Sequence, residues 1–514
     1  MSDRTWDGVA PEVVVVGAGP TGVTAAILLA EAGVRTLVLD RWHDVFSQPR
    51  AVHLDDEVFR ILAGLGIAEE FAKISIPGAG LRLLSADHTP LVQFDRTDPQ
   101  TCNGYPQANM FDQPDLEALL RARMHDLDLL SFRGNVYATA VRVDVAGGPE
   151  VEYIDRDTQQ THVVRPRFVF GCDGANSLTR EAIGSTMNDL GFPEQRWLVV
   201  DIATPRNLGH WGGVHQICDS RRAATYMRIG ATRHRWEFEL LDGESAATYA
   251  TREALAPLLA PWETDISDFE VLRAAEYTFR AQLADKWRQA GVFILGDAAH
   301  LTPPFIGQGM GAGIRDAANL SWKVAAVVNG HLPAGVLDSY ETERRPHART
   351  LIKLAAAVGR AMTGGGRAGD RLRSIVVPRL LHLPGMRRKV LDSVTPALAA
   401  SELNRRRRFL RGLAGTLCPN AVLDSGERFD AAVGNRFALV VQDASTGVFE
   451  RLRAFDVVVV SASSSPDLAA WLRRHQAALV RPDRTVLAAG TVERVLGQAP
   501  FTASTAARSD QSYG

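Results

Sequence analysis

The chain has 514 residues, a formal net charge of −2 and 23% charged residues. Because a single hydrophobic core stops growing near about 250–300 residues, this length predicts more than one domain. The balanced charge excludes the basic excess with which proteins bind nucleic acid or anionic membranes, so we predict neither partner.

The first predicted unit is a strand–turn–helix–strand that runs from Val13 to Asp40. Four consecutive valines predict a parallel strand that is buried on both faces. Gly17, Gly19 and Gly22 then form a G-x-G-x-x-G pattern. The first glycine permits a tight turn, the second lets a pyrophosphate approach the backbone, and the third lets the helix pack close to the strand.

A helix from Thr21 to Ala32 and a second strand from Val34 to Leu39 complete this unit, which ends at Asp40. The acid comes about twenty residues after the glycines, where a ribose hydroxyl would be held. The helix N-terminus offers free N–H groups to phosphates. We therefore predict a dinucleotide site, the alternative being an ordinary glycine turn in an α/β domain.

Two polar residues between the next predicted elements are candidates for ligand contacts. Arg50 lies in a loop, where an arginine either neutralises a ligand or is simply solvated. Gln113 lies at the start of a helix predicted from Phe111 to Met124, from which an amide could reach a ligand.

Two later apolar strands, 167–171 and 291–295, are each followed by an acid, Asp173 and Asp297. Open α/β sheets bind ligands at the carboxyl ends of their strands, although Asp173-Gly174 is also a common turn sequence. A segment rich in Pro and Gly follows Asp297 and precedes a helix predicted to begin near Gly311. Its glycines would let a flat ring lie against the backbone. His300, just past the strand, is either a base or a structural residue.

The remaining segments predict an antiparallel meander at 136–164, a β-rich layer from Trp197 to Phe279 and a final α/β region. The four cysteines are widely spaced and predict neither a zinc site nor disulfides. The polar N-terminus and the lack of a long apolar run predict a soluble, cytoplasmic protein.

Taken together, GAGPTG with Asp40, CDGANSLTR around Asp173 and GDAAHLTPPFIGQGMGAGIRDAANLSWK around Asp297 resemble the class A FAD-dependent aromatic monooxygenases, the p-hydroxybenzoate hydroxylase-like enzymes. Within that class, PRAVHLDDE, ERRPHA and VRPDRTVLA are most similar to the 3-(3-hydroxyphenyl)propionate hydroxylases. The resemblance implies a Rossmann-like, glutathione-reductase-like α/β fold. It assigns an FAD-binding domain to 1–80, 105–190 and 285–395, a β-rich substrate domain to 81–104 and 191–284, and a thioredoxin-like domain without C-x-x-C to 396–514.

The same resemblance implies roles for individual residues. Gly17, Gly19 and Gly22 would meet the pyrophosphate of FAD, Asp40 the ribose, and Asp297 the ribityl chain, while Asp173 would serve both FAD and the pyridine nucleotide. Arg50 and Pro304 would position the reactants. The full set of expected cofactor contacts is Gly17, Gly19, Pro20, Thr21, Gly22, Asp40, Arg41, Arg50, Gln113, Asp173, Gly296, Asp297, Pro304, Gly307, Gly309 and Met310. Tyr226 and Arg228 are the substrate candidates in the β-rich layer.

The implied reaction is hydroxylation of a phenol by dioxygen through a flavin C4a-hydroperoxide, with NADH or NADPH reducing the FAD. A 3-(3-hydroxyphenyl)propionate-type acid is the expected substrate. Two alternatives stay open: an oxygenase of secondary metabolism that acts on a polyketide-like phenol, and a non-catalytic FAD-binding redox sensor. The resemblance also leaves a homodimer open, and no metal is expected.

Overall fold

The computed structural model describes residues 9–46, 51–363, 395–406, 412–442 and 456–500. A six-stranded sheet contains the predicted strand–turn–helix–strand unit, in the order β20-β21-β12-β1-β2-β8. All neighbouring strands are parallel except β20 and β21. Its strands are β1 (Val13–Val16), β2 (Thr36–Leu39), β8 (Leu130–Arg133), β12 (Phe168–Gly171), β20 (Arg288–Gln289) and β21 (Val292–Ile294).

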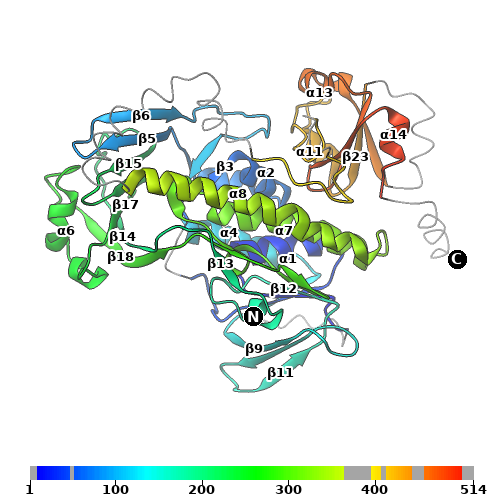
Figure 1. Ribbon diagram of the computed structural model, residues 1–514, viewed down its shortest axis with the longest axis horizontal. Coiled ribbons are helices and arrows are strands. Elements are labelled where there is room, and N and C mark those ends of the chain that lie inside the picture. The colour runs from blue at the N-terminus through cyan, green and yellow to red at the C-terminus, as the bar shows by residue number, and fades with distance from the viewer. Residues whose placement is uncertain (1–8, 47–50, 364–394, 407–411, 443–455, 501–514) are drawn as a thin grey trace.

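Helices cover this sheet, and the long α7 and α8 cross the middle of the molecule (Figure 1). One boundary differs from the prediction, since α7 begins at Gly309 rather than near Gly311. Pro346 lies within α8. The helices are α1 (Pro20–Glu31), α2 (Asp56–Gly64), α3 (Ala68–Ile74), α4 (Gln113–His125), α5 (Leu178–Ala182), α7 (Gly309–Val328) and α8 (Asp338–Thr363), and the 3-10 turns are η1 (Ala246–Tyr249), η2 (Gly296–Ala298), η3 (Pro304–Ile306), η4 (Ala334–Leu337) and η5 (Ala462–Ser464).

A second, seven-stranded sheet has the order β18-β14-β17-β16-β15-β5-β6. Its β5 and β6 come from early in the chain, and β5 pairs with β15 in parallel. One face packs on α6 (Arg252–Leu259) through a separate apolar cluster that includes Trp236 and Leu255. The strands are β5 (Gly80–Ser85), β6 (Pro90–Asp95), β14 (Gln195–Ala203), β15 (Val214–Cys218), β16 (Ala224–Arg228), β17 (Arg233–Glu239) and β18 (Glu270–Phe279).

Three small sheets complete this part of the molecule. The meander predicted at 136–164 is present as the antiparallel strands β9, β10 and β11. The other two have the orders β13-β19-β22 and β3-β7-β4. Their strands are β3 (His53–Asp55), β4 (Ile76–Pro77), β7 (Ala108–Met110), β9 (Val136–Arg142), β10 (Glu150–Asp155), β11 (Thr161–Val164), β13 (Met187–Asp189), β19 (Gln282–Ala284) and β22 (His300–Leu301).

The C-terminal unit, defined here by the described residues from 395 onward, contains a four-stranded sheet of order β24-β23-β25-β26. It forms the orange-to-red lobe beside α2 and α7 (Figure 1). Among the described residues, none of the helices has both the length and the apolar character needed to cross a bilayer. The elements are β23 (Phe437–Val441), β24 (Val457–Ser461), β25 (Ala477–Val480), β26 (Val486–Gly490), α11 (Phe429–Val433), α13 (Pro466–Leu472) and α14 (Val492–Leu496).

Buried neutral histidines predict that acid destabilises the fold. Burial lowers the pKa of His53, His215 and His234 to about 4, against about 6.5 in the unfolded chain. Their contribution to the free energy of unfolding is therefore complete above pH about 6.5. It is lost as the pH falls toward 4, because the unfolded state then binds more protons than the folded state. Asp56 acts in the opposite sense, since burial raises its pKa to about 6.

A variant isolates the histidine contribution from that of Asp56. His215→Gln keeps a donor for the carbonyl of Trp211, which lies 3.1 Å from the His215 Nε2 atom, but cannot titrate. Urea unfolding at neutral pH and near pH 5 should show a smaller loss of stability in the variant than in the unmodified chain. Equal losses would mean that His215 is not buried as a neutral ring.

Candidate functional site

The segments around Gly17, Asp173 and Asp297 follow β1, β12 and β21. These strands are parallel neighbours, so the three segments meet at the carboxyl ends of the six-stranded sheet. The amide of Gly17 donates to the carbonyl of Leu39 at 2.8 Å, which closes the turn after β1 over the end of β2. Gly17 has φ +105°, and a Cβ there would lie 2.3 Å from the carbonyl oxygen of Cys172. Only glycine fits this position, because both the backbone angle and the contact with the end of β12 exclude a side chain.

The start of α1 leaves space and donors for a phosphate. Gly19 is the N-cap, and no side chain caps the helix. A Cβ added to Gly19 would meet no atom within 4 Å. The turn therefore presents uncapped N–H groups to open space, as pyrophosphate binding requires.

Asp40 shapes the same turn. Its carboxylate accepts the amide of Ala18 at 2.6 Å and that of Trp42 at 2.7 Å. Each carboxylate oxygen has a further lone pair with which to accept a ribose hydroxyl. The residues present thus fit the dinucleotide that the resemblance implies.

The start of α7 converges on the start of α1. A Cβ on Gly296 would lie 2.9 Å from the Oγ1 atom of Thr21, and a Cβ on Gly313 would lie 2.2 Å from it. Thr21 therefore fits between two glycines, which brings the segment around Asp297 next to the first turn. Asp297 is half-buried within η2. Like α1, α7 has no side-chain cap at its N-terminus.

A buried ion cluster behind η2 decides the role of His300. Its Nε2 atom lies 2.7 Å from Asp316, which also accepts the amide of Gly296 at 3.1 Å and the Nε–H of Arg344 at 2.8 Å. Burial disfavours the charged carboxylate, but His300 and Arg344 outweigh it and lower the pKa of Asp316. His300 is 1% exposed, so we assign it a structural role in holding the turn.

Asp173 also turns its carboxylate toward the protein. It accepts the hydroxyl of Ser177 and both the amide and hydroxyl of Thr179. Arg180, from the same segment, donates to the carbonyl of Ala298 at 3.1 Å. The second motif thus supports the turn of the third.

Three further expected contacts are Gln113, Arg50 and Arg41. Gln113 accepts the amide of Ala51 at 2.6 Å and so fixes the segment that follows Arg50. Arg50 itself lies outside the described residues. Arg41 is exposed and packs over the ring of Trp42 at 5.7 Å.

The segment from Pro304 to Met310 is anchored to the seven-stranded sheet by Phe305. The Phe305 ring contacts Trp197 and Phe279 edge-on, with centroids 5.9 Å from each. Its carbonyl accepts the side-chain amide of Gln216 at 2.8 Å. Pro304 is exposed. The remaining members of the segment, Gly307, Gly309 and Met310, lie in or beside the start of α7. Gly307 has a left-handed φ of +63°, which no β-branched residue would adopt.

The structure does not bring Tyr226 and Arg228 to this segment. Tyr226 is 1% exposed, and its hydroxyl lies 2.9 Å from the Nδ1 atom of His234. Arg228 donates to the carbonyls of Gly230 and Ala231. Because strand residues alternate between faces, both lie on the face opposite Gln216.

Gln216 is a residue that the sequence reasoning missed. It is 3% exposed, and its Oε1 atom has no partner among the described residues. It shares its face of the sheet with Thr225 and Glu237, which pair across the neighbouring strands. Strand residues alternate between two faces, but this alternation does not tell which face meets Phe305.

We predict that Asp40→Ala weakens FAD binding about tenfold, because it removes a carboxylate acceptor while the start of α1 remains. Asp40→Asn, which keeps one acceptor oxygen, should lose less affinity for FAD than Asp40→Ala. Titrating the flavin-free chains with FAD measures both affinities. If Asp40→Ala lost FAD binding as completely as a variant of Gly17, Asp40 would act only by shaping the turn.

Comparison with known proteins shows a match to the FAD binding domain family over residues 10–355. The chain is 32% identical over 493 residues to the probable NADH-specific resorcinol 4-hydroxylase of Rhodococcus jostii, covering 92% of this chain and 91% of that protein. It is 30% identical over 523 residues to the 3-(3-hydroxy-phenyl)propionate/3-hydroxycinnamic acid hydroxylase of Burkholderia cenocepacia, covering 93% of each.

Solved structures share the fold across nearly the whole chain. Anhydrotetracycline hydroxylase from Streptomyces rimosus superposes with a TM-score of 0.77 at 24% identity, covering 94% of this chain and 96% of that chain. Aklavinone-11 hydroxylase, solved with FAD and aklavinone, gives 0.77 at 22% identity, covering 98% and 97%.

Proposed function

Because this chain belongs to the FAD binding domain family and is an FAD-dependent aromatic hydroxylase, we propose that it hydroxylates a small phenol with NADH and dioxygen in the cytoplasm. One observation carries the choice of a small phenol. The similarity to the resorcinol and 3-(3-hydroxy-phenyl)propionate hydroxylases extends over more than nine-tenths of the chain. The similarity to the probable NADH-specific resorcinol 4-hydroxylase favours NADH over NADPH.

Bound flavin would supply the oxygen chemistry, through the C4a-hydroperoxide that the resemblance implies. The chain's own residues would bind the flavin and orient the substrate. The turn at Gly17–Gly22 and the start of α7 would hold FAD, and Phe305 would fix the segment beside its ring system. The seven-stranded sheet would form the substrate domain, with Gln216 facing the substrate, and the C-terminal unit would be a thioredoxin-like domain without a redox role.

Gln216 is the residue we place nearest the phenol. Its buried Oε1 atom lacks a partner among the described residues, and an unpaired buried acceptor is costly unless a ligand donor meets it. A phenol hydroxyl is such a donor.

Substrate-stimulated NADH oxidation tests the proposal. Resorcinol, 3-(3-hydroxyphenyl)propionate and a polyketide-like phenol are added in turn to the purified flavoprotein with NADH and isotopically labelled dioxygen. We expect a small phenol to accelerate NADH oxidation and to gain one labelled oxygen atom. Hydroxylation of the polyketide alone would favour the alternative oxygenase of secondary metabolism. A lack of stimulation by all three phenols would contradict the proposed reaction.

A further inference from the structure

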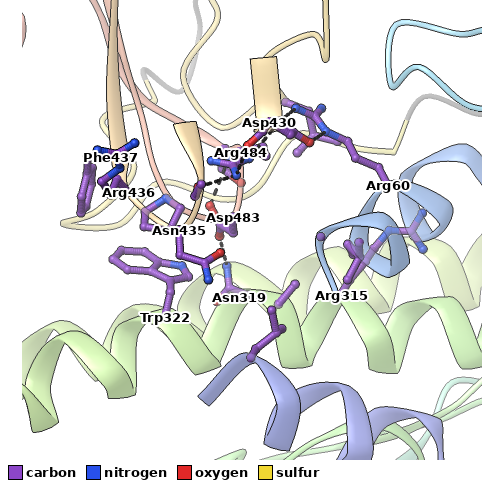
Figure 2. A pocket seen from close by; sticks show the side chains of 18 of the residues that line it. Arg60, Arg315, Asn319, Trp322, Asp430, Asn435, Arg436, Phe437, Asp483 and Arg484 are labelled. Carbon is purple, nitrogen blue, oxygen red and sulfur yellow. Dashed lines mark hydrogen bonds and ion pairs between the residues drawn. The ribbon is translucent and has the colours of Figure 1, made fainter. Parts of the chain in front are cut away.

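A cavity of about 980 Å³ lies between α1, α2 and α7 on one side and the C-terminal unit on the other. Figure 2 shows Asn319 and Trp322 rising from α7 toward Asn435, Asp483 and Arg484 of the C-terminal unit. None of the described residues that line it belongs to the cofactor site proposed above. Its volume is within the range of small-molecule sites.

One wall of this interdomain cavity is aromatic. Trp322 on α7 meets Phe437 at the start of β23 edge-on, with ring centroids 5.5 Å apart. Leu28, Leu332 and Val457 extend the apolar lining. A flat apolar ring could therefore be buried here.

Four buried nitrogen atoms of the lining have no hydrogen-bond acceptor among the described residues. Two of them are the Nε of Arg315, which nevertheless lies 2.8 Å from Glu57, and the Nε2 of His347. The other two lie nearest the C-terminal unit. These two, on which the argument rests, are the indole Nε1 of Trp322 and the Nη1 of Arg484, and both atoms are buried. The rest of the Arg484 guanidinium is occupied, since Nε pairs with Asp430 at 2.9 Å and Nη2 donates to the carbonyl of Gly434 at 2.6 Å. Buried donors without partners are rare and costly, so each indicates a missing acceptor.

The charges of the lining limit how much negative charge an occupant can carry. Its described residues include six arginines and five carboxylates, a balance of plus one. Most are already paired, as Arg60 is with Asp430 at 2.6 Å and Arg315 with Glu57 at 2.8 Å. Arg315 and Arg344 also pair with Asp55 and Asp316, which lie outside the lining. A polyphosphate would therefore find too little positive charge, and a singly charged group would have to be held by the unpartnered donors. The lining residues with formal charge are Arg60, Arg315, Arg344, Arg428, Arg436, Arg484, Glu31, Glu57, Asp430, Asp456 and Asp483.

From these features we propose that the interdomain cavity binds an aromatic monocarboxylate. Its ring packs against Trp322 and Phe437, and its carboxylate accepts hydrogen bonds within the polar part of the lining, where Trp322 and Arg484 supply the unpartnered donors. This binding does not depend on which phenol the enzyme hydroxylates.

Calorimetric titration of the FAD-loaded protein with 2-naphthoate tests the proposal, with neutral 2-naphthalenemethanol as the comparison ligand. Trp322→Phe keeps an aromatic ring but removes the indole N–H. Arg484→Lys keeps the positive charge but removes the planar guanidinium and its Nη1 donor. We expect 2-naphthoate to bind about three- to tenfold more weakly to each variant. Trp262→Phe is the matched control, because the Nε1 atom of Trp262 is equally without a partner but lies in the cluster beneath the seven-stranded sheet.

The outcomes separate this site from the substrate site. Weaker binding in both variants, with an unchanged control and unchanged circular dichroism, supports the proposal. Three results overturn it: no binding of 2-naphthoate, equal binding of the neutral alcohol, or binding that perturbs the flavin spectrum and is unaffected in Trp322→Phe. The last result would mean that naphthoate occupies only the substrate site. If Arg484→Lys fails to fold, Trp322→Phe alone decides.

Discussion

Gly17→Val is expected to purify without FAD, with its affinity for FAD lowered by more than about a hundredfold. Gly17 has φ +105°, which a β-branched residue does not adopt without strain. A Cβ there would also lie 2.3 Å from the carbonyl oxygen of Cys172, so the turn would have to move away from the end of β12. The N–H groups at the start of α1 would move with it. Flavin released by denaturation, per mole of chain, measures the loss.

Two alanine variants separate loss of the site from loss of the fold. Gly19→Ala introduces no strain, because its Cβ would point into open space; it should nevertheless weaken FAD binding, since that space is where the pyrophosphate would lie. Gly335→Ala likewise meets no atom within 4 Å but is remote from the turn, and it should bind FAD normally. A yellow Gly17→Val protein with full FAD content would contradict this description of the turn.

The nucleotide-binding core could be predicted from the sequence because its signals are local. Four consecutive valines occur where a strand is buried on both faces, and all four are at most 5% exposed. The spacing of Gly17, Gly19 and Gly22 follows from the geometry of one turn, although Gly17 and Gly22 also pack against Cys172 at the end of β12. These patterns depend on backbone geometry, which few residues satisfy.

The substrate side could not be predicted in the same way. Alternation along β15 and β16 divides their residues between two faces, but only the tertiary packing of Phe305 shows that Gln216, and not Tyr226, faces the loop. His300 was ambiguous for the same reason. Its partner, Asp316, is identified only once α7 is placed behind η2.

The attachment of the C-terminal unit also escaped sequence reasoning, since its partners are far apart in the chain. Arg481, just after β25, donates to both carboxylate oxygens of Glu343 on α8, at 2.7 and 3.1 Å. Glu343 also accepts from Lys323 and Asn319 of α7, each at 2.9 Å. Burial disfavours the charged form of Glu343, but Arg481 and Lys323 outweigh it and hold its pKa well below the usual range.

Arg481→Ala should therefore destabilise the protein by about 3–5 kcal/mol, the usual cost of removing one partner from a buried ion pair. Arg481, Glu343 and Lys323 are all 0% exposed, so water cannot replace the missing guanidinium without opening the interface. The Arg481 Nη1 atom also donates to the carbonyl of Leu403 at 3.0 Å, and that bond would be lost as well. Urea unfolding, followed by limited proteolysis of the C-terminal unit, measures the effect.

The controls for this substitution distinguish charge from geometry. Arg474→Ala removes an exposed arginine of the same unit and should change stability by less than about 0.5 kcal/mol. Arg481→Lys keeps a cation but cannot reach both oxygens of Glu343. Its loss of stability should therefore lie between those of Arg474→Ala and Arg481→Ala. If Arg481→Ala cost less than about 1 kcal/mol, the desolvation of the cluster would already cancel its attraction. The C-terminal unit would then be held by its apolar contacts, including Phe437 against Trp322, rather than by these charges.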